Sequence, residues 1–205
     1  HRLSVPRNSI RLIIMKTPRI LVFGGSLRAD SYNHKLAVLA AEGAREAGAD
    51  VTLISLRDFQ LPIFDEDLEK AEGMPDAARR LKALFTENDG LIIASPEYNS
   101  TVTAVLKNTI DWVSRTTSPD EKPLSALSGK SAAILAASPG GYGGSRGLAQ
   151  LRPSLENIGI SVLPEQVTLP RAHEAFDADG KLTDVQVVAS IKALGASLVT
   201  KLAEA

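Results

Sequence analysis

Cysteine is absent from this sequence of 205 residues. Its absence excludes disulfides, thiolate metal sites, cysteine-held iron–sulfur clusters and cysteine nucleophiles. Any redox activity would therefore require a bound cofactor. No cluster of histidines and carboxylates at metal-ligand spacing takes the place of the missing thiols, so we expect no metal site.

Charge of one sign is not in excess either. The chain holds 23 basic and 24 acidic residues, for a formal net charge of -1, and the basic residues are scattered. This pattern favours neither nucleic acid nor an anionic membrane surface as a partner. No apolar run approaches the roughly 20 residues that cross a bilayer. We expect a cytoplasmic protein that acts on small molecules.

The length and the apolar fraction of 44% suffice for one core. The segment Met15–Arg19 immediately precedes the first apolar run and looks like a natural start, and residues 1–14 lack the pattern of a signal peptide. We therefore interpret residues 1–14 as an extension and residues 15–205 as a single domain.

Short apolar runs alternate with helical patterns along the chain, which is typical of βαβ units and a parallel sheet. The runs expected to form strands are 20–23, 51–55, 91–94, 132–136, and 160–163 with 167–169. The expected helices are 33–47, 76–88, 104–114, 147–157 and 184–203. Right-handed crossovers then predict a doubly wound α/β sheet of five parallel strands in the order 2-1-3-4-5, with helices on both faces. The stretches 57–75 and 115–129 are expected to be surface loops.

The segment after the first run carries Ser26, Arg28 and Ser31 just before a helix. N–H groups at a helix N-terminus favour a phosphate, hydroxyls donate hydrogen bonds to it, and a guanidinium adds charge. Each residue alone would also suit an ordinary helix cap. No G-x-G-x-x-G follows this run, so a Rossmann fingerprint is absent. Gly129-Lys130-Ser131 resembles the end of a P-loop, but Leu124 stands in place of the first glycine and a strand follows.

The segment Ser95–Ser100 follows the third run and contains Pro96, Glu97, Tyr98 and Asn99. In doubly wound sheets, ligands bind beyond the carboxyl ends of the strands, at the point where the strand order reverses. Here that point lies between strands one and three, whose loops are dense in polar residues and glycine. An aromatic, an amide and a rigid proline suit a flat molecule with polar edges, which we interpret as a flavin.

Taken in order and spacing, three segments resemble the NADPH-dependent FMN reductase family, a flavodoxin-like group that includes quinone, azo and chromate reductases. The resemblance runs from Arg19 to about Ala203. The segments are Gly25-Ser26-Leu27-Arg28 with Ser31-Tyr32-Asn33, Pro96-Glu97-Tyr98-Asn99 with Leu106 to Trp112, and Ser138 to Gly144.

This resemblance implies FMN as the cofactor, with its phosphate and ribityl end in the first segment and its ring between the other two. Because Pro96 has no N–H, donors to the ring edge would be backbone N–H groups from Glu97 onward. No catalytic side chain is expected, since the flavin carries the chemistry. The cofactor-binding residues implied are Ser26, Arg28, Ser31, Tyr32, Asn33, Pro96, Glu97, Tyr98, Asn99, Ser138, Gly140, Gly141 and Gly143.

The implied reaction is ping-pong. NADPH or NADH passes a hydride to FMN and leaves, and a quinone, free flavin, azo compound or chromate then takes the electrons. Relatives of this kind assemble as homodimers or homotetramers. The main alternative is a non-enzymatic electron carrier like a flavodoxin, but flavodoxins are strongly acidic and lack the arginine that stands here as Arg28. A domain of this fold that binds no flavin is a further alternative.

Several side chains keep two interpretations. The Glu97 carboxylate could pair with Arg28 or with a neighbouring subunit. Trp112, with Ile110 and Val113, could reach a partner subunit or pack in the core. The segment Phe59–Asp67 would form a rim beside the cofactor.

Three arginines are candidates for the phosphates of the nicotinamide cofactor on charge alone: Arg115, Arg146 and Arg152.

Overall fold

The computed structural model describes residues 16–204, so the predicted extension, residues 1–14, lies outside the described residues. Within this range, five parallel strands form one sheet in the order β2-β1-β3-β4-β5. The predicted sheet type and strand order are confirmed. The strands are β1 (Arg19–Gly24), β2 (Asp50–Ser55), β3 (Gly90–Ala94), β4 (Ser131–Ala137) and β5 (Ser161–Leu169).

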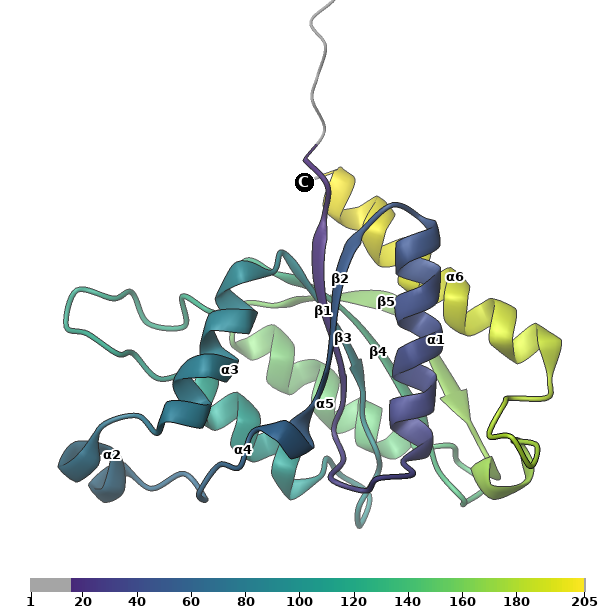
Figure 1. The fold of residues 1–205 in the computed structure, drawn as a ribbon, viewed down its shortest axis with the longest axis horizontal. Helices are drawn as coiled ribbons and strands as arrows, with labels where there is room; N and C mark the ends of the chain where they lie inside the picture. The colour runs from purple at the N-terminus through teal and green to yellow at the C-terminus, as the bar shows by residue number, and fades with distance from the viewer. Residues whose placement is uncertain (1–15, 205) are drawn as a thin grey trace, which may run out of the picture.

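Helices cover both faces of the sheet (Figure 1). The helices α1 and α6 pack on one face, and α3, α4 and α5 lie on the other. The helices are α1 (Tyr32–Glu46), α2 (Glu66–Glu72), α3 (Asp76–Glu87), α4 (Ala104–Val113), α5 (Ser145–Asn157) and α6 (Val185–Ala203), with the 3-10 turns η1 (Leu56–Asp58) and η2 (Ala172–Glu174).

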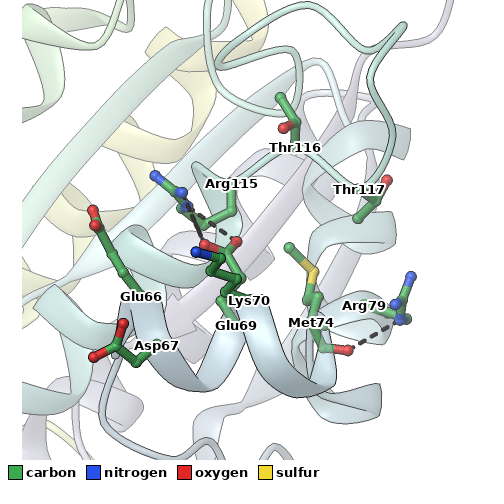
Figure 2. Close-up of a pocket in the computed structure, with 10 residues that line it drawn as sticks. Glu66, Asp67, Glu69, Lys70, Met74, Arg79, Arg115, Thr116 and Thr117 are labelled. Carbon is green, nitrogen blue, oxygen red and sulfur yellow. Dashed lines mark hydrogen bonds and ion pairs between the residues drawn. The ribbon is translucent and has the colours of Figure 1, made fainter.

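The stretch 57–75 differs from the expected surface loop, because it holds most of η1 and all of α2. Asp65 caps α2 by accepting hydrogen bonds from the N–H groups of Asp67 and Leu68. The carboxylates at the start of α2 suit the positive end of the helix dipole. Figure 2 shows Glu69 of α2 facing Arg115 at the end of α4, with an ion pair of 2.8 Å between them. The sequence shows the capping residue, Asp65, but the helix is short and contains few apolar residues, so no helical pattern predicts it.

Trp112 is fully buried, which excludes direct contact with a partner subunit. Its ring packs edge-on against Phe64, with 5.0 Å between the ring centroids, and its indole N–H donates to the Pro62 carbonyl. Trp112 belongs to a small cluster with Met74 and Ala78, away from the sheet. The core interpretation is therefore correct, with the 62–78 segment rather than the sheet as the partner.

Strand β5 is continuous, whereas the sequence predicted two pieces. It lies at the edge of the sheet, and its register against β4 shifts between Ala132 and Ile134. An edge strand tolerates proline and charged residues. The exposed Pro164 and Glu165 therefore interrupt the apolar pattern without ending the strand.

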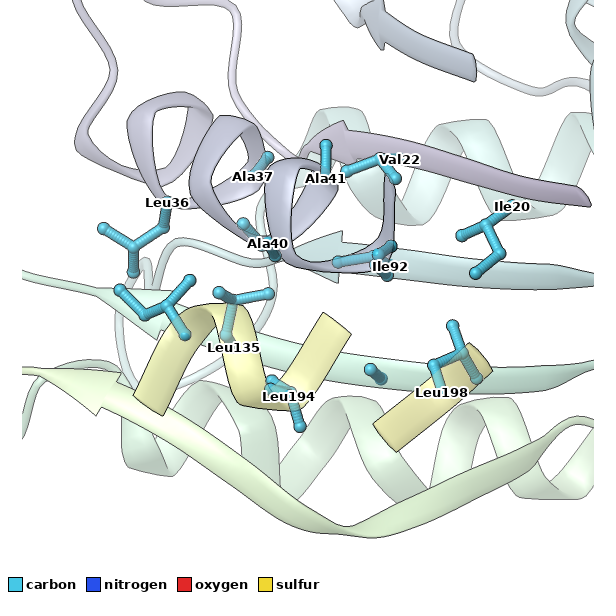
Figure 3. Close-up of a cluster of buried hydrophobic side chains, with 14 of the residues drawn as sticks. Ile20, Val22, Leu36, Ala37, Ala40, Ala41, Ile92, Leu135, Leu194 and Leu198 are labelled. Carbon is cyan, nitrogen blue, oxygen red and sulfur yellow. The ribbon is translucent and has the colours of Figure 1, made fainter. Parts of the chain in front are cut away.

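Side chains on the sheet alternate between its two faces. In β1, Ile20 and Val22 face α1 and α6, while Leu21 and Phe23 face the other helices. Figure 3 shows the first face, where alanines of α1 lie against Ile92 of β3. Burial on both faces accounts for the largely apolar sequences of the three central strands, β1, β3 and β4.

Small residues bring α1 and α6 into close contact. A Cβ atom on Gly43 would lie 2.1 Å from the Lys192 carbonyl oxygen, and one on Gly195 would lie 2.2 Å from that of Ala40. No side chain larger than hydrogen fits at either position. α6 is also long and apolar enough to span a membrane by composition, but Ile191 and Leu198 are buried against the sheet and α1. One face of α6 therefore packs against the core.

The P-loop interpretation fails in the structure as it did in the sequence. Gly129-Lys130-Ser131 leads directly into β4 rather than into a helix. The Lys130 ammonium is buried and donates to the Asn88 carbonyl, and this burial lowers the pKa of Lys130. The lysine therefore has a structural role at the amino end of the sheet.

The stretch 115–129 lacks strands and α-helices, as expected, and a partly buried ion pair fixes it in place. The Lys82 ammonium on α3 donates to the Glu121 carboxylate and to the Arg115 carbonyl. Ser125 and Thr117 also donate to Glu121. Led by the hydrogen bond from Lys82, these donors lower the pKa of Glu121 from 4.5 to about 2.

Glu121 should make the stability of the protein pH-dependent. Because its pKa is lower in the folded state, its stabilisation is present above about pH 5 and declines as the pH falls toward 2. We expect Glu121→Gln to reduce the free energy of unfolding at pH 7 by about 2 kcal/mol. On acidification, the free energy of unfolding of this variant should fall by less than that of the wild type. Urea unfolding followed by Trp112 fluorescence measures both. Equal acid sensitivity of the two proteins would contradict this role.

Candidate functional site

The loops that follow β1, β3 and β4 meet at the carboxyl edge of the sheet (Figure 1). The sequence placed its candidate residues in these three loops, and the topology brings them together. The β1 loop and the first two residues of α1 supply Ser26 through Asn33, the β3 loop supplies Pro96 through Asn99, and the β4 loop supplies Ser138 through Gly143.

The β1 loop leads into the N-terminus of α1. Ser31 is the N-cap, and its hydroxyl oxygen accepts from the His34 N–H. Ser26 is buried and accepts from the Arg28 N–H, while the Arg28 side chain is exposed. The first N–H groups of α1 have no partner within the helix. Two hydroxyls, a guanidinium and a helix N-terminus thus follow one another in this segment, which we call the anion cradle as a candidate phosphate site.

Thr103 joins the β1 and β3 loops, a role that the sequence reasoning missed. Its hydroxyl donates to the Gly25 carbonyl at 2.6 Å and accepts from the Leu106 N–H as the N-cap of α4. The Gly25 N–H in turn donates to the Ala94 carbonyl. Threonine before a helix is a recognisable capping signal, but its contact across 78 residues is visible only in the structure.

Asn33 joins the β1 loop to β4. Its amide donates to the Ala137 carbonyl and accepts from the Ala137 N–H, both at 2.9 Å. The side chain is buried, so it serves as a structural bridge rather than as a group exposed for a ligand. The backbone N–H of Asn33 is one of the first N–H groups of α1, and these belong to the anion cradle.

The β3 loop makes a tight turn at its tip. Tyr98 and Thr101 exchange two backbone hydrogen bonds, and the residues between them, Asn99 and Ser100, have positive φ angles of 52° and 67°. Such angles are costly for residues other than glycine and are typical of two-residue hairpin turns and of functional sites. The Tyr98 ring is half exposed at this tip. Because the Tyr98 N–H is already bonded, it cannot donate to a ligand.

Glu97 pairs with Arg146, and neither Arg28 nor a neighbouring subunit is needed to neutralise it. Its carboxylate lies 2.6 Å from the guanidinium and also accepts from the Gly147 N–H at the start of α5. The Glu97 side chain is buried, and the Arg146 guanidinium lies 4.5 Å from the centre of the Tyr142 ring. One buried carboxylate thus joins the β3 and β4 loops.

The β4 loop is rich in glycine, and Gly140 and Gly141 expose backbone beside the exposed Tyr142 side chain. Gly143 and Gly144 have positive φ angles, and a Cβ on Gly144 would lie 2.6 Å from that of Ala136. A Cβ placed on Gly141 would have no atom of the described residues within 4 Å, its two chain neighbours aside. Gly140 is held by a hydrogen bond from its N–H to the Ser138 hydroxyl. A flat molecule can therefore lie directly against Gly141.

Two cavities flank the β1 loop. One, of about 390 Å³, lies between Ser26, Arg28 and Tyr98. The other, of about 400 Å³, is lined by Phe59 and Leu61. Leu27 and Val105 line both cavities. Of the predicted 59–67 rim, residues 59–61 lie beside the β1 loop, whereas Asp65 caps α2 and Glu66 and Asp67 line a separate cavity with Arg115.

The three arginines proposed for nicotinamide phosphates lie in separate places and already have partners. Arg115 lines a polar cavity of about 560 Å³ between α2 and the 115–117 segment that follows α4, and it pairs with Glu69 (Figure 2). Arg146 pairs with Glu97, and Arg152 donates to the Leu163 carbonyl. In residues 16–204, no group of three histidines or carboxylates is arranged to hold a metal ion.

The sequence pattern of the NADPH-dependent FMN reductase family matches residues 18–174. The chain belongs to this family. It is therefore an oxidoreductase of a flavin-dependent type, and the predicted resemblance is confirmed. It is 39% identical to an NAD(P)H-dependent FMN reductase of Pseudomonas aeruginosa over 167 residues, which span 81% of this chain and 85% of that one.

A quinone reductase of Pseudomonas putida is 34% identical over 166 residues, spanning 80% of this chain and 84% of the relative. The fold is similar to that of FerB, a flavoenzyme NAD(P)H:(acceptor) oxidoreductase of Paracoccus denitrificans, with a TM-score of 0.73. That likeness has 28% identity and covers 92% of this chain and 98% of FerB.

The Asn33 bridge should contribute strongly to stability. We expect Asn33→Leu, which removes both hydrogen bonds to Ala137 and leaves two buried backbone groups unpaired, to reduce the free energy of unfolding by about 2–4 kcal/mol. Asn108 is a matched control, since its amide also makes two backbone hydrogen bonds but is half exposed. Asn108→Leu should cost less in the same urea titration. Equal losses would mean that the Asn33 bridge is no more than a surface contact.

Proposed function

We propose that this protein is an FMN-dependent NAD(P)H oxidoreductase that reduces quinones and related small acceptors. The observation that carries the proposal is the anion cradle of Ser26, Arg28 and Ser31 beside the β3 and β4 loops. A ligand that carries both a phosphate and a planar ring needs an anion site next to a site for the ring. The relatives named as FMN reductases and quinone reductases support the same conclusion.

The chemistry of the cradle fits the phosphate end of FMN. Ser26 and Ser31 would donate hydroxyl hydrogen bonds, and the N–H groups of Tyr32 and Asn33 would add the positive end of α1. Arg28 would supply a charge-assisted contact from the solvent side. The Asn33 amide contributes by holding this loop on β4 rather than by touching the phosphate.

The β3 and β4 loops fit the ring end. The open space at Gly141 admits a flat ring, and Pro96 with Tyr98 would bound its other side. Because Tyr98 uses its own N–H for Thr101, the N–H groups of Glu97 and Asn99 are the proposed donors to the polar edge. Ser138, Gly140 and Gly143 shape the β4 loop that completes the site.

When bound, FMN supplies the redox chemistry, taking a hydride from a reduced nicotinamide and passing two electrons to an acceptor. The residues of the chain position the two reactants and exclude water from one face. We propose a ping-pong order, in which the oxidised nicotinamide leaves before the acceptor occupies the same open face. Quinones, free flavin, azo compounds and chromate are the proposed acceptors. We also propose that the protein acts in the cytoplasm, where NADPH and NADH are regenerated.

We further propose that the protein forms a homodimer or homotetramer through the carboxyl edge. Four of its exposed large apolar side chains lie on loops that follow strands at this edge: Leu27, Ile63, Tyr98 and Tyr142. Exposed apolar groups gathered in one region are typical of interaction surfaces. A second copy would cover them and enclose the cofactor.

An anaerobic titration tests the proposed function. The purified protein should take up FMN, and the flavin absorbance of the complex should bleach when NADPH or NADH is added and return when a quinone follows. Faster bleaching by one donor would identify the preferred nicotinamide. A bound flavin that neither donor reduces would instead support the electron-carrier alternative, and absence of FMN binding would leave only the fold.

Arg28 should contribute to FMN affinity through the phosphate. We expect Arg28→Ala to weaken FMN binding by about 1–3 kcal/mol, the range for a hydrogen bond to a charged group. Riboflavin, which lacks the phosphate, should bind both proteins alike. Arg45, at the other end of α1, is the matched control, and Arg45→Ala should leave FMN affinity unchanged. Fluorescence quenching of each flavin measures the affinities, and unchanged FMN binding by Arg28→Ala would remove Arg28 from the site.

A further inference from the structure

A small hairpin at residues 176–182 lies against the N-terminal turn of α1. Phe176 and Leu182 pair as an antiparallel bridge, and Gly180 turns with a φ of 76°. The Asp177 carboxylate closes the turn by accepting from the N–H groups of Asp179 and Lys181. The hairpin follows residue 174, where the match to the family ends, so it lies outside the shared sequence pattern.

Phe176 of this hairpin stacks on Tyr32, the first residue of α1. The two ring centroids are 5.5 Å apart and the ring planes differ by 14°, which is the geometry of a stacked pair. The Arg28 guanidinium lies 5.5 Å from the centre of the same Tyr32 ring, within the range of a cation–π contact. The hairpin therefore contacts Tyr32, and Tyr32 contacts the exposed cation of the anion cradle.

A second cation holds the pair together. The Lys35 ammonium lies 5.1 Å from the centre of the Phe176 ring and 5.9 Å from that of Tyr32. It is also ion-paired with Asp30 of the β1 loop at 2.6 Å. This pair lowers the pKa of Asp30, chiefly through the hydrogen bond from Lys35. The hairpin, α1 and the β1 loop thus share one cluster of two rings and two cations.

Without this cluster, the side chain of Arg28 would have little to fix it. It is exposed, and only its backbone N–H has a hydrogen bond within the loop. An unconstrained arginine loses rotamer freedom when it binds an anion, and a ring that already orients the guanidinium reduces that loss. Stacking on Phe176 fixes the Tyr32 ring, and through it Arg28.

We propose that the 176–182 hairpin helps to retain FMN, because Phe176 positions Tyr32 and Arg28 at the phosphate. This inference rests on the proposed function, and Phe176 acts as a positioning residue that does not itself touch the cofactor. Its loss should therefore affect ligands that carry the phosphate and spare those that do not.

The test compares FMN and riboflavin binding to Phe176→Ala. An aromatic pair contributes about 0.5–1.5 kcal/mol, so we expect FMN to bind about 2- to 12-fold more weakly, mostly through faster dissociation in stopped-flow fluorescence. Riboflavin affinity should change by less than about twofold. Phe176→Tyr keeps the ring and should restore FMN binding, which separates positioning from a general loss of structure.

The double variant Arg28→Ala with Phe176→Ala tests whether Phe176 acts on FMN binding through Arg28. If Phe176 acts through Arg28, removing it after Arg28 is gone should cause little further loss of FMN affinity. Additive losses, or equal losses for FMN and riboflavin, would overturn the proposal. Wild-type protein that fails to bind FMN would instead contradict the proposed function, whereas tight FMN binding unaffected by Phe176→Ala would overturn this inference alone.

Discussion

The candidate site depends on the two hydrogen bonds between the Asn33 amide and the backbone of Ala137. In the strand order, β3 lies between β1 and β4, so this bridge carries the β1 loop across the end of β3. The bridge places the N-terminus of α1 beside the β4 loop, which is the arrangement that the proposed FMN site requires. Because both groups of Ala137 are buried, the arrangement is costly to break.

Two further side chains complete the set of connections between loops. Thr103 holds Gly25 of the β1 loop, and Glu97 holds Gly147 beyond the β4 loop. Each is a polar side chain that satisfies a backbone group of another segment, so the loops have defined positions before any ligand arrives. This preorganisation supports the positive φ angles at Asn99 and Ser100, which would be unfavourable in a free loop.

Much of the fold follows from patterns in the sequence, because apolar runs mark the strands and helical patterns alternate with them. The site loops were also predictable, since chain order alone places the ends of β1, β3 and β4 at one edge. Asn33 was expected to face the ligand, and its partner Ala137 is 104 residues away, a pairing that no local pattern encodes. The pairing of Glu97 with Arg146, 49 residues apart, was hidden for the same reason. Trp112 has a partner segment that includes the unexpected helix α2.

The most direct test of this account is a crystal structure of the protein with FMN. The account predicts the phosphate within hydrogen-bond distance of Ser26, Ser31 and the first N–H groups of α1, and the ring against Gly141 in the β4 loop. A flavin bound elsewhere, as in the polar cavity beside Arg115, would contradict it.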